Sequence, residues 1–150
     1  MKINSHFRFF TIMNQQLFQI ALVVSDYDEA INFYTQKLGF ELLEDTALSQ
    51  TKRWVVVKPK GDGGCRMLLA KAANAEQKRA VGAQAGGRVF LFLHTDDIER
   101  DYKNLKEKNV KIVREFSEEP FGKVLVFEDL DGNLWDLIEP PYSQPLFNTL

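Results

Sequence analysis

The size, composition and charge of the chain place it in a broad class and exclude others. It has 150 residues, of which 45% are hydrophobic and 27% are charged, a composition typical of one globular domain and not of a disordered tail. Nineteen Lys and Arg against 21 Asp and Glu give a net charge of −2. Because nucleic-acid binding needs a basic excess, we expect no nucleic-acid partner. The longest apolar runs, such as residues 89–93, are far shorter than the roughly 20 residues of a membrane-spanning helix, so we expect no membrane partner.

The N-terminal segment and the single cysteine bear on where the protein resides. Cys65 has no second cysteine in the chain with which to form a disulfide, which fits a reducing compartment, and we expect a cytoplasmic protein. Residues 1–16 lack the unbroken apolar run of a signal peptide because Arg8 interrupts it. We assign this extension no role; translation from Met13, or a short arm on the surface, is the simplest explanation.

The first half of the chain predicts one helix and four strands. Residues 18–24 form an apolar run typical of a buried strand. Asp26 followed by Glu29 indicates a helix start, and Gly39 indicates the helix end. Three more strands are expected at residues 40–44, 54–57 and 66–70, with a glycine-rich turn at 59–64.

The second half repeats this order after a linker. Residues 72–85, rich in Ala, Gln and Lys, predict a surface helix that ends before Gly86. A strand is expected at residues 89–93, a helix start at Asp96, and a helix end at Asn109. The last three strands are expected at residues 110–114, 124–127 and 134–138, with a turn at 129–133.

The two halves are therefore tandem βαβββ modules. Matching positions lie about 70 residues apart, as Asp26 and Asp96 do. We expect one domain at residues 17–139, made of modules 17–72 and 88–139 with a linker at 73–87. Residues 140–150 are expected to form an irregular tail, because two prolines follow the last strand.

An α+β fold with an exposed concave sheet follows from this pattern. One helix per module covers only one face of its sheet. Two such modules side by side form a curved mixed sheet around a cleft, and concave surfaces of this kind are where small ligands bind. A small organic molecule is the partner that this architecture predicts.

Two segments resemble a known family. Residues 20–34 (IALVVSDYDEAINFY), followed by 37–40 (KLGF), and residues 127–137 (FEDLDGNLWDL) are similar to the opening and closing motifs of the glyoxalase/bleomycin-resistance/dioxygenase (vicinal oxygen chelate) superfamily. The likeness covers residues 18–139. It implies the two-module fold, a divalent metal held by up to four side chains from the first and last strands of each module, and Lewis-acid chemistry on a chelated substrate.

The resemblance places four residues at the metal-ligand positions: Gln19, Leu68, Phe90 and Asp136. Leucine and phenylalanine have no donor atom, whereas catalytic zinc takes three protein ligands and a water. We therefore expect no metal cofactor, with Gln19 and Asp136 as vestigial ligands. A divalent metal remains the alternative.

Without a metal, the cleft is predicted to be an apolar and aromatic cavity. Arg66 and Asp136 are charges that need a partner there, either a side chain or a ligand, and Arg66 is the candidate for an anionic ligand group. Arg66 reaching solvent, His94 at the surface, and Trp54 and Trp135 in the core are the plainer alternatives. The predicted cavity residues are Gln19, Trp54, Arg66, Leu68, Phe90, Phe92, His94 and Asp136.

Two functions from different classes are consistent with this site. The first is a protein that binds or sequesters an apolar or aromatic organic ligand, similar to the drug-binding members of the family, and forms a homodimer. The alternative is a metal-dependent enzyme, namely a glyoxalase-type lyase, an isomerase or a ring-cleaving dioxygenase, that uses Gln19 and Asp136. No catalytic residue is identified. Residues 118–122 are considered as a flap over the cavity or as an ordinary turn.

Overall fold

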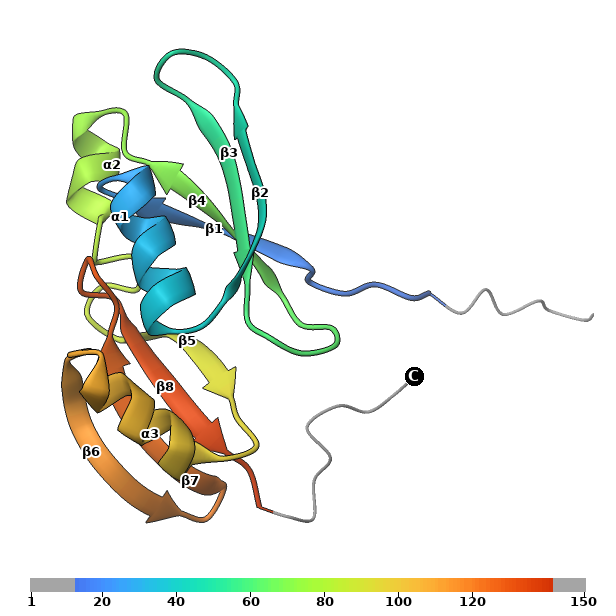
Figure 1. The fold of residues 1–150 in the computed structure, drawn as a ribbon, viewed down its shortest axis with the longest axis vertical. Helices are drawn as coiled ribbons and strands as arrows, with labels where there is room; N and C mark the ends of the chain where they lie inside the picture. Colours follow the sequence, from blue (N-terminus) through green and yellow to red (C-terminus); the bar gives the residue numbers. More distant parts are fainter. Residues whose placement is uncertain (1–12, 142–150) are drawn as a thin grey trace, which may run out of the picture.

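The computed structural model describes residues 13–141 of the chain. Expectations for residues 1–12 and 142–150 lie outside this range. Within it, each half folds as a βαβββ module, as the repeat predicts (Figure 1).

The first module contains a four-stranded sheet in the order β1-β4-β3-β2, in which β1 and β4 are parallel and the other pairs are antiparallel. Its helix continues directly into a π-helical turn, η1. The elements are β1 (Gln19–Val24), α1 (Tyr27–Asn32), η1 (Phe33–Lys37), β2 (Glu41–Ala47), β3 (Arg53–Lys58) and β4 (Arg66–Lys71).

The second module has the equivalent order β5-β8-β7-β6, again with its outer pair, β5 and β8, parallel. A short helix, α2 (Ala75–Ala80), lies in the linker. The elements of the module are β5 (Val89–His94), α3 (Ile98–Glu107), β6 (Ile112–Glu119), β7 (Gly122–Glu128) and β8 (Leu134–Glu139).

Helix starts follow the side-chain caps, with one correction. Asp26 accepts hydrogen bonds from the N–H groups of Asp28 and Glu29, at 2.9 and 3.0 Å, and so starts α1 as expected. The start predicted at Asp96 is wrong, because Asp97 is the capping residue of α3 and accepts from the N–H of Arg100 at 3.0 Å. Asp96 instead pairs with the guanidinium of Arg100.

The segment considered as a flap is a hairpin turn. Strand β6 continues to Glu119, further than the sequence pattern predicted, and β7 begins at Gly122. Gly122 has a φ of 132°, a backbone conformation that L side chains rarely adopt. Residues 118–122 therefore belong to a paired β-ribbon.

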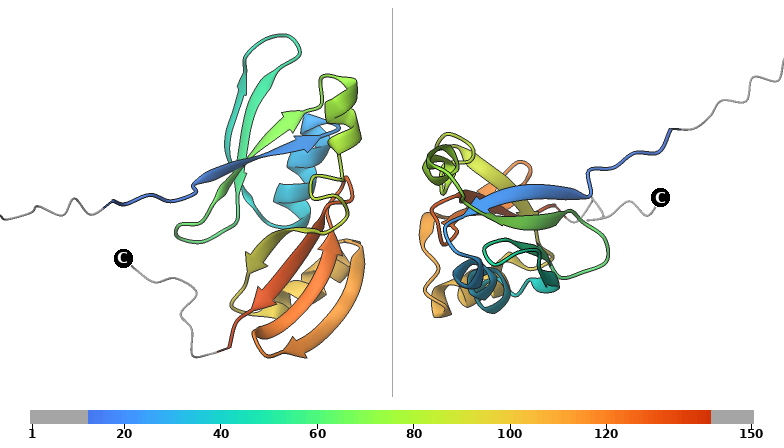
Figure 2. Two further views of the ribbon diagram at one scale, coloured as in Figure 1. Left: turned by 180° about the vertical axis from the view of Figure 1, so that it is seen from behind. Right: turned by 90° about the horizontal axis from the view of Figure 1, so that it is seen from above.

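The helices of both modules lie on one side of the molecule and share one apolar core. Figure 1 shows α1 and α3 in front of their sheets, and the left view of Figure 2 shows the opposite sheet faces uncovered. Core residues come from both modules, including Leu22 and Val57 of the first and Leu125 and Leu137 of the second. Each sheet thus has one face covered by a helix and one face, called the open face below, without a helix.

A buried carboxylate joins the two modules. Asp129, in the β7–β8 turn, is 6% exposed. Its Oδ1 accepts the backbone N–H groups of Asp131, Gly132 and Asn133 at 2.9–3.1 Å. Its Oδ2 accepts the hydroxyl of Tyr34 from the first module at 2.6 Å.

Aromatic packing and the linker reinforce this junction. The rings of Tyr34 and Phe40 each lie 6.0 Å from that of Trp135, and burial together with the nearby Asp129 raises the pKa of Tyr34, which keeps its hydroxyl a donor. The linker passes so close to the turn that a Cβ at Gly82 would lie 1.9 Å from the carbonyl oxygen of Asp131.

Replacing Asp129 should weaken the whole fold. Asp129→Asn replaces one carboxylate oxygen by an NH₂ group, which would face the N–H or O–H groups that now donate to that oxygen. We therefore expect the free energy of unfolding to fall by about 3 kcal/mol. Chemical denaturation of the variant measures this. Asp131→Asn, in the same turn, is the control, because Asp131 pairs with Ser25 at an exposed site and should change stability by less than about 1 kcal/mol. Equal stability of the two variants would contradict the assigned role of Asp129.

Candidate functional site

The open face of the second sheet forms a hollow with a volume of about 810 Å³. The strand register explains its composition, because residues opposite one another in β5, β8 and β7 alternate between the core and this face. All of its lining residues belong to the second module or precede it directly: Gly87, Arg88, Val89, Phe92, Val113, Arg114, Val126, Leu134 and Asp136.

The predicted fold class of two tandem βαβββ modules is confirmed, and the hollow lies on one of the two sheets. The chain forms two separate four-stranded sheets, and the hollow draws on the second alone. The open face of the first sheet lies elsewhere on the same side of the molecule (Figure 2). The two modules meet through the core beneath their helices, where Tyr34 and Phe40 pack against Trp135. Because the sheets are joined on that side, their open faces point away from the core.

Two of the predicted cavity residues, Phe92 and Asp136, meet in the hollow. They are directly opposite each other in the β5–β8 ladder. Phe92 is 64% exposed, an unusually open position for a phenylalanine on a sheet. Asp136 is only 8% exposed. An accessible ring therefore stands beside a buried carboxylate.

The Asp136 carboxylate is poorly compensated. Its Oδ1 is buried and has no hydrogen-bond partner among the residues that the structure describes. The nearest cation, Nη2 of Arg114, is 3.7 Å from this oxygen, beyond hydrogen-bonding distance, and the Arg114 side chain is 59% exposed. Burial raises the pKa of Asp136, and the charge of Arg114 opposes that shift.

Phe90 does not line the hollow, although the repeat placed it there. The β5–β8 ladder shifts register between Val89 and Leu91, which pair with Leu134 and Trp135. Phe90, between Val89 and Leu91, is therefore the extra residue of a bulge. Phe90 packs against the core instead. The extra residue moves Val89 into the hollow, and a count along the sequence cannot reveal such a shift.

Four predicted cavity residues lie in the first module, away from the hollow. Gln19 is opposite Arg66 at the start of the β1–β4 ladder, and Leu68 is opposite Ala21. The Arg66 guanidinium lies 5.2 Å from the ring centre of Phe18, not beside Asp136. Trp54 is 36% exposed, and its Nε1 donates to Glu44 at 3.1 Å.

The remaining candidates follow the plainer alternatives. His94, at the end of β5, is exposed and is not among the lining residues of the hollow. Trp135 is 2% exposed and stacks on Phe127 at 5.9 Å in the core. The sequence analysis missed four residues that line the hollow: Val89, Val113, Arg114 and Val126. The alternation of side chains along β7 could have indicated Val126. Nothing in the sequence indicates that the path of β6 brings Arg114 close to Asp136.

The residues present do not fit a catalytic metal. Among residues 13–141, no three His, Cys, Asp or Glu side chains lie close enough together to hold an ion. The Asp136 carboxylate is bordered by Phe92 and Val126 in the ladder, and neither has a donor atom. One carboxylate among hydrocarbon provides too few ligands for the metals that proteins use in catalysis.

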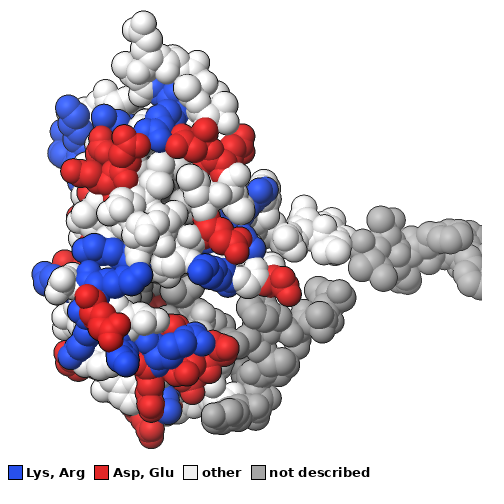
Figure 3. All heavy atoms as spheres, in the orientation of Figure 1, with Lys and Arg blue, Asp and Glu red and all other residues white. Residues whose placement is uncertain are grey.

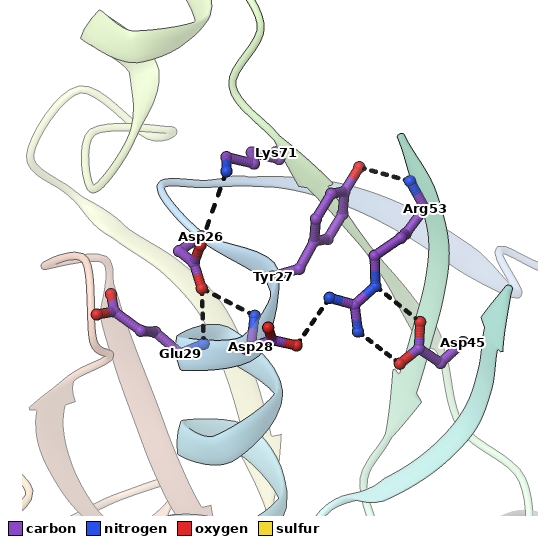
Figure 4. Close-up of polar contacts among 7 residues, drawn as sticks. All are labelled: Asp26, Tyr27, Asp28, Glu29, Asp45, Arg53 and Lys71. Carbon is purple, nitrogen blue, oxygen red and sulfur yellow. Dashed lines mark hydrogen bonds and ion pairs between the residues drawn. The ribbon is translucent and has the colours of Figure 1, made fainter. Parts of the chain in front are cut away.

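A second hollow, of about 620 Å³, lies at the start of α1 and has a structural explanation. Arg53 forms a two-bond contact with Asp45, at 3.0 and 2.6 Å, and a third bond to Asp28 at 2.7 Å (Figure 4). The hydrogen bond from Arg53 lowers the pKa of Asp45. Lys71 lies 3.7 Å from Asp26. Because these charges satisfy one another, the cluster fixes the β2–β3 hairpin to α1.

The surface has no large area of one charge on the face shown in Figure 3, where basic and acidic side chains alternate over both modules. No helix in the described part of the chain has the length and apolar character needed to cross a membrane.

Comparisons with known proteins agree with the fold. The model of the Glyoxalase/Bleomycin resistance protein/Dioxygenase superfamily matches residues 16–137. An uncharacterized protein of Shewanella frigidimarina (strain NCIMB 400) is 55% identical over 135 residues, which cover 89% of this chain and 100% of that protein.

Two solved structures resemble the chain in both sequence and fold. UcmS2 superimposes with a TM-score of 0.74 at 31% identity, covering 85% of this chain and 99% of that one. TnmS3, an antibiotic binding protein from Streptomyces sp. CB03234, has a TM-score of 0.69 at 29% identity and covers 85% and 98%. With matching motifs, module order and sheet topology, the chain belongs to the Glyoxalase/Bleomycin resistance protein/Dioxygenase superfamily.

Proposed function

We propose that this protein binds and sequesters a planar, largely apolar organic molecule in the hollow of its second module, without a metal. The observation that carries the proposal is that the exposed Phe92 ring stands beside the buried carboxylate of Asp136, whose Oδ1 has no hydrogen-bond donor among the described residues. Both side chains are unfavourable in the free protein, and a ligand that covers the ring and meets the carboxylate relieves both.

The volume and chemistry of the hollow support this role. About 810 Å³ is within the range of small-molecule sites, and the lining combines apolar side chains with two arginines and one aspartate. The antibiotic binding by TnmS3 shows that a member of this family with the same fold can have a binding role. The donor-poor surroundings of Asp136 argue against the metal-dependent enzyme as the first choice.

Assembly is the second part of the proposal. We infer a symmetric homodimer in the cytoplasm, in which a second copy covers the exposed edge strand β2 of the first sheet. Leu42 and Leu43 are 43% and 42% exposed on β2, and neither lines the hollow. Apolar side chains gathered on sheet faces and edges are typical of surfaces that association covers.

Asp136→Asn should stabilise the free protein. The substitution removes a buried charge at constant size, so we expect the free energy of unfolding at neutral pH to rise by about 1 kcal/mol. The raised pKa of Asp136 gives the pH dependence its sign. In the native protein, the protonated Asp136 side chain contributes its full stability below about pH 4, the pKa of an aspartate in the unfolded chain. That contribution is lost as the pH rises through the higher pKa of Asp136 in the folded protein.

The advantage of Asp136→Asn over the native protein should therefore vanish in acid. Denaturation curves of both proteins at neutral and acidic pH measure it. A variant less stable than the native protein at neutral pH would show that the carboxylate has a partner and that the site is not poised for a ligand.

Ligand binding should depend on Phe92. A thermal-shift screen of planar aromatic compounds should find ligands, because a ligand at a hundred times its Kd stabilises a protein by about 2.7 kcal/mol. For such a compound, Phe92→Ala should weaken binding at least about fivefold, since ring stacking contributes about 1 kcal/mol beyond area burial. Phe121→Ala is the matched control, because Phe121 is also exposed, at 55%, but lies at the β6–β7 turn. Equal losses in both variants would place the ligand elsewhere.

The oligomeric state can be measured directly. Light scattering coupled to size exclusion should give twice the mass of the 17.3 kDa chain. Leu42→Lys puts a charge on the exposed edge strand β2 and should shift the mass toward that of the monomer, whereas Leu130→Lys, at an exposed position in the β7–β8 turn, should leave it unchanged. A native protein of 17.3 kDa would refute the dimer.

A further inference from the structure

The buried oxygen of Asp136 specifies the chemistry of the ligand beyond its shape. Oδ1 is an acceptor with no donor among the described residues, and buried polar groups almost always have a partner in native proteins. The residues opposite it in the ladder, Phe92 and Val126, are hydrocarbon. In the structure no side chain of the hollow donates to this oxygen, which leaves it available to a donor group of a ligand.

The position of Phe92 indicates where on the ligand that donor lies. Neighbouring strands are about 4.8 Å apart, so the side chains of opposite residues stand side by side on one face. An aromatic ligand stacked on the exposed Phe92 ring has its edge over the Asp136 carboxylate. The donor is then a substituent on the ring edge, not a group at the end of a long chain.

The charges around the hollow favour a neutral donor over a cation. Arg114 lies 3.7 Å from Oδ1, and Arg88 also lines the hollow. Two guanidinium groups against one carboxylate disfavour an ammonium ion at this position, since like charges repel. A hydroxyl or an uncharged N–H satisfies Oδ1 without meeting that repulsion.

We propose that the ligand is a planar aromatic molecule with an uncharged O–H or N–H on its ring edge, which donates a hydrogen bond to Oδ1 of Asp136 while the ring stacks on Phe92. This inference rests on the proposed function of the hollow. It assigns to Asp136, at a position where the family's motif has a metal ligand, the direct recognition of an organic donor group.

Matched probes test the inference on the full-length native protein. Hydroxypyrene and methoxypyrene, substituted at the same ring carbon, share the ring and the oxygen, but only the first has a donor. Fluorescence titration at neutral pH, where the hydroxyl keeps its proton and Asp136 is ionised, should show hydroxypyrene binding at least about tenfold tighter, the ratio expected when one hydrogen bond to a carboxylate is lost. Pyrenemethylammonium, a cation of similar shape, should bind less tightly than hydroxypyrene.

Variants assign the preference to one residue. In Asp136→Leu the two neutral probes should bind with equal affinity, within about twofold, because the acceptor is absent and the apolar surface remains. Asp62→Leu removes the same charge from an exposed loop residue and should keep the preference. Circular dichroism and the melting temperature establish that both variants are folded.

The outcomes separate the two proposals. If both neutral probes bind the native protein equally, or if Asp136→Leu keeps the preference, the donor inference is wrong and the binding function stands. Tighter binding of the ammonium probe than of hydroxypyrene also overturns the inference, in favour of a cationic ligand. If no probe binds the native protein, both the inference and the proposed function are contradicted.

Discussion

The buried carboxylate of Asp129 is the interaction on which the rest of the structure depends. It organises the β7–β8 turn through three backbone N–H groups and anchors the first module through Tyr34. The direction of β8 follows from this turn, and strand alternation then turns Trp135 to the core and Asp136 to the open face. One side chain thus contributes both to the contact between the modules and to the placement of the polar group of the hollow.

The sequence predicted the architecture because its signals are local and repeated. Asp26 and Asn109 are examples: a carboxylate that caps a helix and a residue with positive φ that ends one depend on their immediate neighbours. The site was harder to predict. The bulge at Phe90 exchanges which side chain faces the hollow, and the proximity of Arg114 to Asp136 depends on the path of β6. Such features arise from pairing between distant segments, which no local pattern encodes.

The hollow combines features that stability alone does not favour. An exposed phenylalanine and a buried carboxylate without a hydrogen-bond donor are each unfavourable in a free protein, yet they occupy facing positions. By contrast, the other charged hollow, around Arg53, is fully compensated within the chain. Unsatisfied polar groups reduce stability and are retained in proteins chiefly where function needs them. Because Asp136 lacks a hydrogen-bond partner among the described residues and Arg53 does not, we place the ligand in the hollow of the second module.

The junction between the modules also governs how the chain acquires its structure. Tyr34 and Asp129 are 95 residues apart in the sequence, so the bond between them closes a loop that spans most of the protein. Closing a loop of this length loses chain entropy before the contact is made, and proteins rich in such non-local contacts fold slowly. Although the two modules are repeats in sequence, neither has its complete core alone, and we expect them to fold as a single cooperative unit rather than one after the other.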